Sequence, residues 1–359
     1  MVDLAKTDSP TTRTATHRSA SVLRFVERAA VPLALLIIVV VFSTLPATGG
    51  TFLTGANIRN ILANQSVTGL IALGMLIPLV ANYFDLSTPA IAGVASVAMA
   101  ALAATHQQSV WLALIAGVLF GLVAGALNGL LISVIRLNPM ISTLGTYILL
   151  GGLLQLYTGG QTILGGMPES VGSWGSQVDL GLPRPFWLLM AVSGAVWFLL
   201  TQTPFGRRLA AIGSNETAAR LAGIRVGRAV FITYLLSALL GGIAGVLLTS
   251  RSGSANATNA ISYLFPALAA VFLGQTSINP GRYNVWGTIF GVFLVAVAVN
   301  GFTILGAAAW VTPVFNGAAL LLSVAASTLL QRSRENRARK AVFRAMQNEA
   351  APSGPIDVR

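Results

Sequence analysis

Apolar residues fill this chain in long runs that charged residues interrupt at only a few points. A helix that crosses a membrane needs about 20 mostly apolar residues. The stretches without Asp, Glu, Lys or Arg predict ten such helices, because two of the longest stretches can hold two helices each. The predicted spans are 30–48, 61–81, 87–104, 111–134, 141–158, 186–202, 229–250, 262–277, 285–305 and 311–330. The pattern predicts an all-α, polytopic membrane protein.

The polar segments predict the domain organisation. No soluble domain fits between the spans, so we expect one transmembrane domain over residues 29–330. Residues 1–28 and 331–359 are polar and basic, and we expect them to be terminal tails. The first apolar run follows basic residues, as in a signal peptide, but its length and the nine later spans favour an uncleaved anchor.

Composition and charge agree with a membrane protein. The 359 residues are 55% hydrophobic and 9% charged, and the mean hydropathy is +0.77. In a soluble protein the net charge of +12 would suggest nucleic acid. With the N-terminus in the cytoplasm, all 22 Lys and Arg except Arg59, Arg184 and Arg251 lie on the cytoplasmic side, as the positive-inside rule requires. We therefore expect cytoplasmic termini, contact with the lipid bilayer and no nucleic acid.

Two short spans suggest an internal repeat. The third span begins Asp85-Leu86-Ser87-Thr88-Pro89, and the eighth begins Ser262-Tyr263-Leu264-Phe265-Pro266. Proline interrupts a regular helix, and broken helices in matching positions of two halves are typical of a transport pathway. Asn128-Gly129 and Asn300-Gly301 recur at a similar offset. We predict a 5+5 inverted repeat; the alternative is chance recurrence of Gly and Pro.

Glycine pairs predict close contacts between helices. Pairs separated by three residues let two helix backbones approach each other. They are Gly121–Gly125, Gly125–Gly129, Gly241–Gly245 and Gly287–Gly291. We expect them to pack within the bundle.

The residue types that support catalysis or metal binding are scarce. There are no cysteines, and His17 and His106 lie far apart, so we predict no catalytic, cofactor-binding or metal-binding residues. No Asp or Glu lies within a predicted span, although ion-coupled carriers usually place ionisable groups there. No G-x-x-x-x-G-K-[S/T] motif occurs, so energy for active transport would come from a partner protein. A self-sufficient secondary carrier and a membrane enzyme are the less supported alternatives.

The cytoplasmic loop 203–228 has features of a docking segment. Ser214 or Asn215 can cap a short helix, Glu216 falls in its favourable first turn, and Gly223 can end it in a left-handed conformation. The apolar residues of this helix are Ala218, Ala219, Leu221 and Ala222. Such a face suits a groove on another protein; the alternative is a basic loop that binds lipid headgroups.

A longer pattern covers the same loop and resembles a known family. The residues that fit F-G-R-x-x-x-A-x-G-x-N-x-x-A-A-x-x-x-G-I are Phe205, Gly206, Arg207, Ala211, Gly213, Asn215, Ala218, Ala219, Gly223 and Ile224. This pattern resembles the cytoplasmic segment of the ribose/xylose-type ABC sugar permeases. Further similar motifs are Asp85-Leu86-Ser87, Asn128-Gly129-Leu130-Leu131-Ile132, Pro139 with Thr143-Leu144-Gly145, and Gly287-Thr288 with Gly291 and Asn300-Gly301. The similarity runs from about residue 57 to residue 327.

The resemblance implies a permease subunit in the inner membrane of a bacterium. Such a subunit of an ABC importer passes a monosaccharide or a related small polar solute inward; a nucleoside, polyol or amino acid is the alternative solute. The implied partners are ATPase subunits that hold ATP and Mg²⁺, an extracytoplasmic substrate-binding protein, and a second permease copy, identical or paralogous. The residues implied to couple to the ATPase are Gly206, Arg207, Ala211, Gly213, Asn215, Glu216, Ala218, Ala219, Gly223 and Ile224.

Polar residues in or beside the spans are candidates for the translocation pathway. They are Asn64, Gln65, Thr68, Asp85, Ser87, Asn128, Thr143 and Asn300. For Asp85, a solvated position at a helix end is the alternative to a gating role.

The chain departs from the resembled pattern in two places. Asn82-Tyr83-Phe84 precedes Asp85 where Gly-Gly-Ile is usual, and Thr88-Pro89 follows Ser87 where Val-Gly is usual. The run Gly274-Gln275-Thr276-Ser277-Ile278-Asn279-Pro280-Gly281 replaces G-G-T-S-x-x-G-G. These departures bear on gating geometry and solute rather than on the class of protein.

Overall fold

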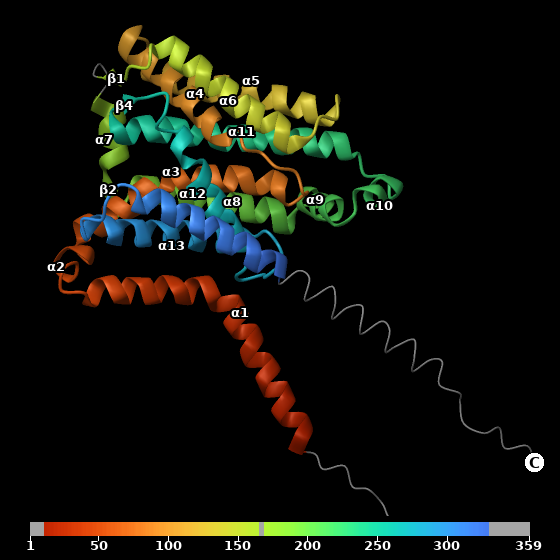
Figure 1. Ribbon diagram of the computed structural model, residues 1–359. Coiled ribbons are helices and arrows are strands. Elements are labelled where there is room, and N and C mark those ends of the chain that lie inside the picture. The colour runs from red at the N-terminus through yellow and green to blue at the C-terminus, as the bar shows by residue number, and fades with distance from the viewer. Residues whose placement is uncertain (1–10, 165–168, 330–359) are drawn as a thin grey trace, which may run out of the picture.

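The structure is a bundle of helices with very little sheet. The computed structural model describes residues 11–164 and 169–329, with side chains from 28–164 and 171–329. In Figure 1 most of the helices lie side by side along one direction. The bundle helices are α1 (Thr11–Thr44), α3 (Gly55–Leu79), α4 (Thr88–Ala100) with its π-helical extension η1 (Ala101–Thr105), α5 (Val110–Ser133), α6 (Pro139–Thr158), α8 (Arg184–Gln202), α11 (Val226–Ser252), α12 (Leu264–Gln275), α13 (Val285–Ile304) and the last span, Val311–Leu329.

Short elements connect these helices. They are α2 (Gly49–Phe52), β1 (Ile163–Leu164), α7 (Glu169–Ser176), β2 (Val178–Asp179), β3 (Leu182–Pro183), α9 (Pro204–Ser214), α10 (Glu216–Leu221), β4 (Ser254–Ala255) and the 3-10 turn η2 (Ile261–Tyr263). The strands β1 and β4 pair antiparallel, as do β2 and β3. Figure 1 shows α9 and α10 at one end of the bundle and α2, α7 and the strands at the other.

Every predicted span corresponds to an apolar helix. Within the described residues, eight helices are long and apolar enough to cross a membrane, and Arg28–Thr44 and Ile261–Gln275 are shorter apolar helices at the first and eighth spans. The prediction of an all-α polytopic membrane protein is confirmed. The first boundary differs, because α1 begins at Thr11 within the predicted N-terminal tail. Residues 1–10 and the predicted tail 331–359 lie outside the described residues.

Each half of the chain contributes one central helix that packs against helices of the other half. Helix α11, from the second half, packs along α4 and α5 of the first half. Helix α3, from the first half, packs along α12 and α13 of the second. Figure 1 shows α4, α5, α6 and α11 gathered in one part of the bundle. An inverted repeat would produce this reciprocal exchange, and the 5+5 repeat stays a prediction.

Glycines allow the closest helix contacts. A Cβ added to Gly245 on α11 would overlap the carbonyl group of Ala92 on α4, and one added to Gly125 on α5 would overlap the Cβ of Ala238 on α11. Small residues therefore bring the backbones of these helices together. The predicted packing role of these glycines within the bundle is confirmed.

The altered run at 274–281 holds the start of the first apolar helix. The hydroxyl of Ser277 and the backbone N–H of Ile278 both donate to the carbonyl oxygen of Arg28, at 2.8 and 2.9 Å. The side chain of Asn284 donates to the carbonyls of Gly274 and Ser277 at 3.0 and 3.1 Å. This connection before α13 therefore fastens α1 to the bundle.

We expect Gly245→Leu to destabilise the bundle, because the new side chain has no space beside Ala92. Forced overpacking costs about 1–3 kcal/mol, so the melting temperature of the detergent-solubilised protein should fall. Gly152→Leu on α6 is the matched control, since a Cβ there meets nothing within 4 Å. Equal melting temperatures for the two variants would contradict the packing role.

Candidate functional site

The segment before α4 is not helical although it is largely buried. Helix α4 begins only at Thr88, with Pro89 in its first turn, and residues 83–87 are not helical. Buried backbone groups outside a helix need other partners, above all within a membrane protein. The Thr143 hydroxyl of α6 accepts from the N–H of Leu86 at 3.1 Å. The Tyr234 hydroxyl of α11 donates to the carbonyl of Phe84 at 2.8 Å.

The side chains of this segment form a buried polar group, which we call the Asp85 cluster: Asp85, Ser87, Asn128 and Thr146. The Ser87 hydroxyl donates to Asp85 Oδ1 at 2.6 Å. Asn128 Nδ2 on α5 donates to Ser87 Oγ at 2.8 Å, and the Thr146 hydroxyl on α6 donates to Asn128 Oδ1 at 2.6 Å. Asp85 is only 2% exposed. The alternative of a solvated Asp85 is therefore wrong: the surrounding helices enclose the carboxylate.

Half of the predicted pathway residues meet at this place. Asp85, Ser87 and Asn128 belong to the cluster, and Thr143 binds the backbone beside them. Thr146 and Tyr234 were missed by sequence reasoning. So was Ser237, whose hydroxyl shares a 2.8 Å hydrogen bond with that of Thr88. A signal existed in α11, because Tyr234 and Ser237 are polar residues at helical spacing in an apolar span.

The other predicted pathway residues lie elsewhere. Asn64, Gln65 and Thr68 are on α3, where Asn64 Oδ1 accepts from Arg251 at 2.5 Å. Asn300 on α13 exchanges two hydrogen bonds with Asn57 at the start of α3, at 2.9 and 3.0 Å. Among the described residues, no hydrogen bond joins these residues to the Asp85 cluster. The sequence therefore grouped residues that the structure separates.

The loop 203–228 folds as two short helices joined at Asn215. The Thr203 side chain caps α9, and the Asn215 side chain caps α10 by accepting from the N–H of Ala218 at 2.9 Å. Glu216 lies in the first turn of α10. Gly223 follows the helix with a φ of 82°, in the left-handed region. The predicted cap, first turn and terminating glycine are all present, and Asn215 rather than Ser214 caps α10.

The two sides of this segment have different surroundings. Gly206 and Ala219 are buried, and a Cβ on Gly213 would overlap the carbonyl oxygen of Val80. Ala219 therefore does not belong to an exposed docking face, and Gly213 packs against its own chain. Leu221 is 86% exposed. The other predicted coupling residues are exposed or partly exposed: Arg207, Ala211, Asn215, Glu216, Ala218, Gly223 and Ile224.

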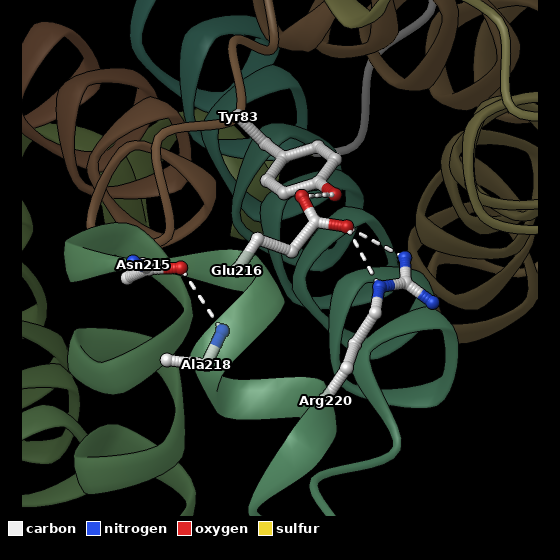
Figure 2. Close-up of polar contacts among 5 residues, drawn as sticks. All are labelled: Tyr83, Asn215, Glu216, Ala218 and Arg220. Atoms are coloured by element: carbon white, nitrogen blue, oxygen red, sulfur yellow. Dashed lines mark hydrogen bonds and ion pairs between the residues drawn. The ribbon is translucent and has the colours of Figure 1, made fainter.

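Glu216 joins α10 to the segment before α4. As Figure 2 shows, Tyr83 points its hydroxyl at Glu216, and Arg220 approaches the other carboxylate oxygen. The Tyr83 hydroxyl donates to Glu216 Oε2 at 3.0 Å, and Arg220 Nη2 lies 2.6 Å from Oε1. Burial and this hydrogen bond raise the pKa of Tyr83 to about 12. The hydrogen bond from Arg220 lowers the pKa of Glu216, so a phenol faces a carboxylate at neutral pH.

Comparisons with known proteins agree on one family. The family described as branched-chain amino acid transport system / permease component matches residues 57–324. The chain is 39% identical to the ribose import permease protein RbsC of Bacillus subtilis (strain 168), over 81% of this chain and 90% of the relative.

Two further relatives come from Escherichia coli (strain K12). The chain is 32% identical to the L-arabinose transport system permease protein AraH, over 76% of this chain and 83% of the relative. It is 30% identical to the D-allose transport system permease protein AlsC, over 83% and 90%. No solved structure matches the chain.

We expect Ser87→Ala to lower the free energy of unfolding by about 1–3 kcal/mol, because it removes a donor to Asp85 and an acceptor for Asn128 in a buried place. Thermal unfolding in detergent measures the change. Ser176→Ala is the control, since that hydroxyl is exposed and, among the described residues, bonds to carbonyls of α7 alone. A Ser87→Ala protein as stable as this control would show that the cluster contributes nothing to the fold.

Proposed function

This chain belongs to the family of permease components of branched-chain amino acid transport systems, and from the names of its relatives we propose that it imports a monosaccharide as the membrane-spanning subunit of an ABC importer. The observation that carries the proposal is the 39% identity to a ribose import permease over 81% of this chain. The family is one of transport components rather than of enzymes.

The charges support a proposed orientation of the chain in the membrane. The protein is a multi-pass inner-membrane permease with several apolar helices. We place α9, α10 and both termini in the cytoplasm, because the arginine-rich end of the bundle is then on the side that the positive-inside rule favours. The strands and α7 then face the outside.

The residues that the described spans lack and those that α10 exposes support the proposed partners. No described span carries an acid that could couple solute to an ion gradient, since Asp85 lies between α3 and α4. We propose that ATP and Mg²⁺ bind to a separate ATPase subunit, which receives α10 around the exposed Leu221. An extracytoplasmic binding protein delivers the solute, and a second permease copy, identical or paralogous, completes the pathway.

The structure suggests what this chain contributes to transport. No bond is made or broken in the solute, so the permease has to bind, orient and release it while access switches from one side to the other. Movement of α10 with the ATPase would reach the helices through its contacts with the rest of the chain. The Asp85 cluster joins α4, α5 and α6 at the end of the bundle nearest to α10, so rearrangement there would change access.

We expect uptake into proteoliposomes only when the chain is reconstituted with a candidate ABC ATPase and a binding protein, in the presence of ATP. Radiolabelled D-ribose, L-arabinose, D-allose and L-leucine form the panel, with a monosaccharide expected to be taken up. Uptake by the chain alone would contradict the ABC mechanism. Uptake of leucine but of no sugar would be compatible with the ABC mechanism, but it would overturn the proposal that the solute is a monosaccharide.

We expect Leu221→Arg to abolish co-purification of the ATPase, because a charge replaces the exposed apolar residue of α10. Membrane insertion and melting temperature should not change, since the side chain is 86% exposed. Leu180→Arg is the matched control: Leu180 is 92% exposed but lies in the β2–β3 turn at the opposite end of the bundle. Retained co-purification by Leu221→Arg would contradict docking through this face.

A further inference from the structure

The connection between α3 and α4 is attached to the coupling segment by two side chains. Asn82 Nδ2 donates to the carbonyl oxygen of Gly213, the penultimate residue of α9, at 2.7 Å. The next residue, Tyr83, donates through its hydroxyl to Glu216 in the first turn of α10 at 3.0 Å (Figure 2). Two consecutive residues thus hold both sides of the junction at which α9 becomes α10.

The same connection leads directly into the Asp85 cluster. The carbonyl of Phe84 accepts a hydrogen bond from the Tyr234 hydroxyl of α11. Asp85 Oδ1 accepts one from the Ser87 hydroxyl. The N–H of Leu86 donates to the Thr143 hydroxyl of α6. Only one residue therefore separates Tyr83 from Asp85. A chain reaches at most about 3.6 Å per residue, so Tyr83 and Asp85 cannot move further apart than about 7 Å. A displacement of α10 that pulls on Tyr83 must move the cluster or break a hydrogen bond.

Close backbone packing limits how far α9 can move relative to the connection between α3 and α4. Gly213 approaches Val80 so closely that a Cβ would overlap the carbonyl oxygen. Asn82 has a φ of 62°, in the left-handed region, and its side chain is therefore turned toward α9 by a tight turn after α3. The covalent route from α10 to α11 is a second connection, and it turns at Gly223, whose φ of 82° suits glycine.

We propose that Asn82 and Tyr83 are positioning residues that transmit the movement of α10 to the Asp85 cluster, and so couple the partner ATPase to access through this end of the bundle. This inference rests on the proposed function. The resembled pattern has glycines at these two positions, and glycine cannot make either side-chain contact. The attachment therefore depends on the side chains that this chain carries at positions 82 and 83.

The test is the coupling ratio of the reconstituted transporter, measured as solute taken up per ATP hydrolysed. We expect the double variant Asn82→Gly/Tyr83→Phe to lower this ratio at least about fivefold, the lower end of typical coupling energies between sites. Glycine accepts the left-handed backbone, and phenylalanine preserves the ring, so folding should be retained. Co-purification of the ATPase should be unchanged, because neither residue is on the exposed side of α10.

Tyr283→Phe is the matched control. Tyr283 lies in the connection before α13, packs against the ring of Phe272, and its hydroxyl bonds to no other described residue. This variant should keep the wild-type coupling ratio. Tyr83→Phe should also have no further effect in a Glu216→Ala background, since the hydroxyl would then have no acceptor.

The outcomes separate this inference from the proposed function. A wild-type transporter that shows no ATP-driven uptake would overturn the proposed function and the inference with it. Wild-type uptake together with an unchanged ratio in the double variant would overturn the inference alone. Loss of ATPase co-purification in the double variant would also overturn it, because Asn82 and Tyr83 would then support docking rather than transmission. If the double variant does not fold, the coupling ratio of the single variant Tyr83→Phe tests the inference instead. A lowered ratio supports it, and an unchanged ratio overturns it.

Discussion

The obligation to pair buried backbone groups organises this end of the bundle. Within a membrane protein an unpaired N–H or C=O group costs several kcal/mol, so a non-helical segment survives only where protein groups or water satisfy it. Residues 83–87 meet this condition with the side chains of Thr143 and Tyr234 and with the Ser87 N–H turned onto Asp85. The polar residues of α5, α6 and α11 therefore have a structural role, which is to satisfy the non-helical segment 83–87. Their place in a transport pathway builds on that role.

These hydrogen bonds depend in turn on how closely the helices approach. Gly245 and Gly125 let α11 lie against α4 and α5, and Tyr234 of α11 reaches the carbonyl of Phe84 in this arrangement. Because α11 comes from the second half of the chain, a segment of the first half is completed by residues far away in the sequence. Packing by small residues and polar pairing are therefore parts of one arrangement.

The sequence was sufficient wherever local chemistry decides the structure. Long apolar runs predicted every span, and Asn215, Glu216 and Gly223 act at the ends of α10 as their side-chain and backbone properties require. It was insufficient where tertiary contacts choose a helix face. Ala219 turns inward and Leu221 outward, although both are apolar residues of one short helix. The partners of Asn300 and Tyr83 could not be predicted for the same reason, since each lies on a distant segment.

The reciprocal pairing of Asn57 and Asn300 has a consequence for the opposite end of the bundle. Each amide is both donor and acceptor to the other, and Asn57 also donates to the carbonyl of Phe52 at 2.8 Å. If α3 and α13 move apart, the two hydrogen bonds between these amides break together, and water or a hydroxylated solute can take their place. Separation of these helices would then be accompanied by new hydration of both amides, which are already partly exposed.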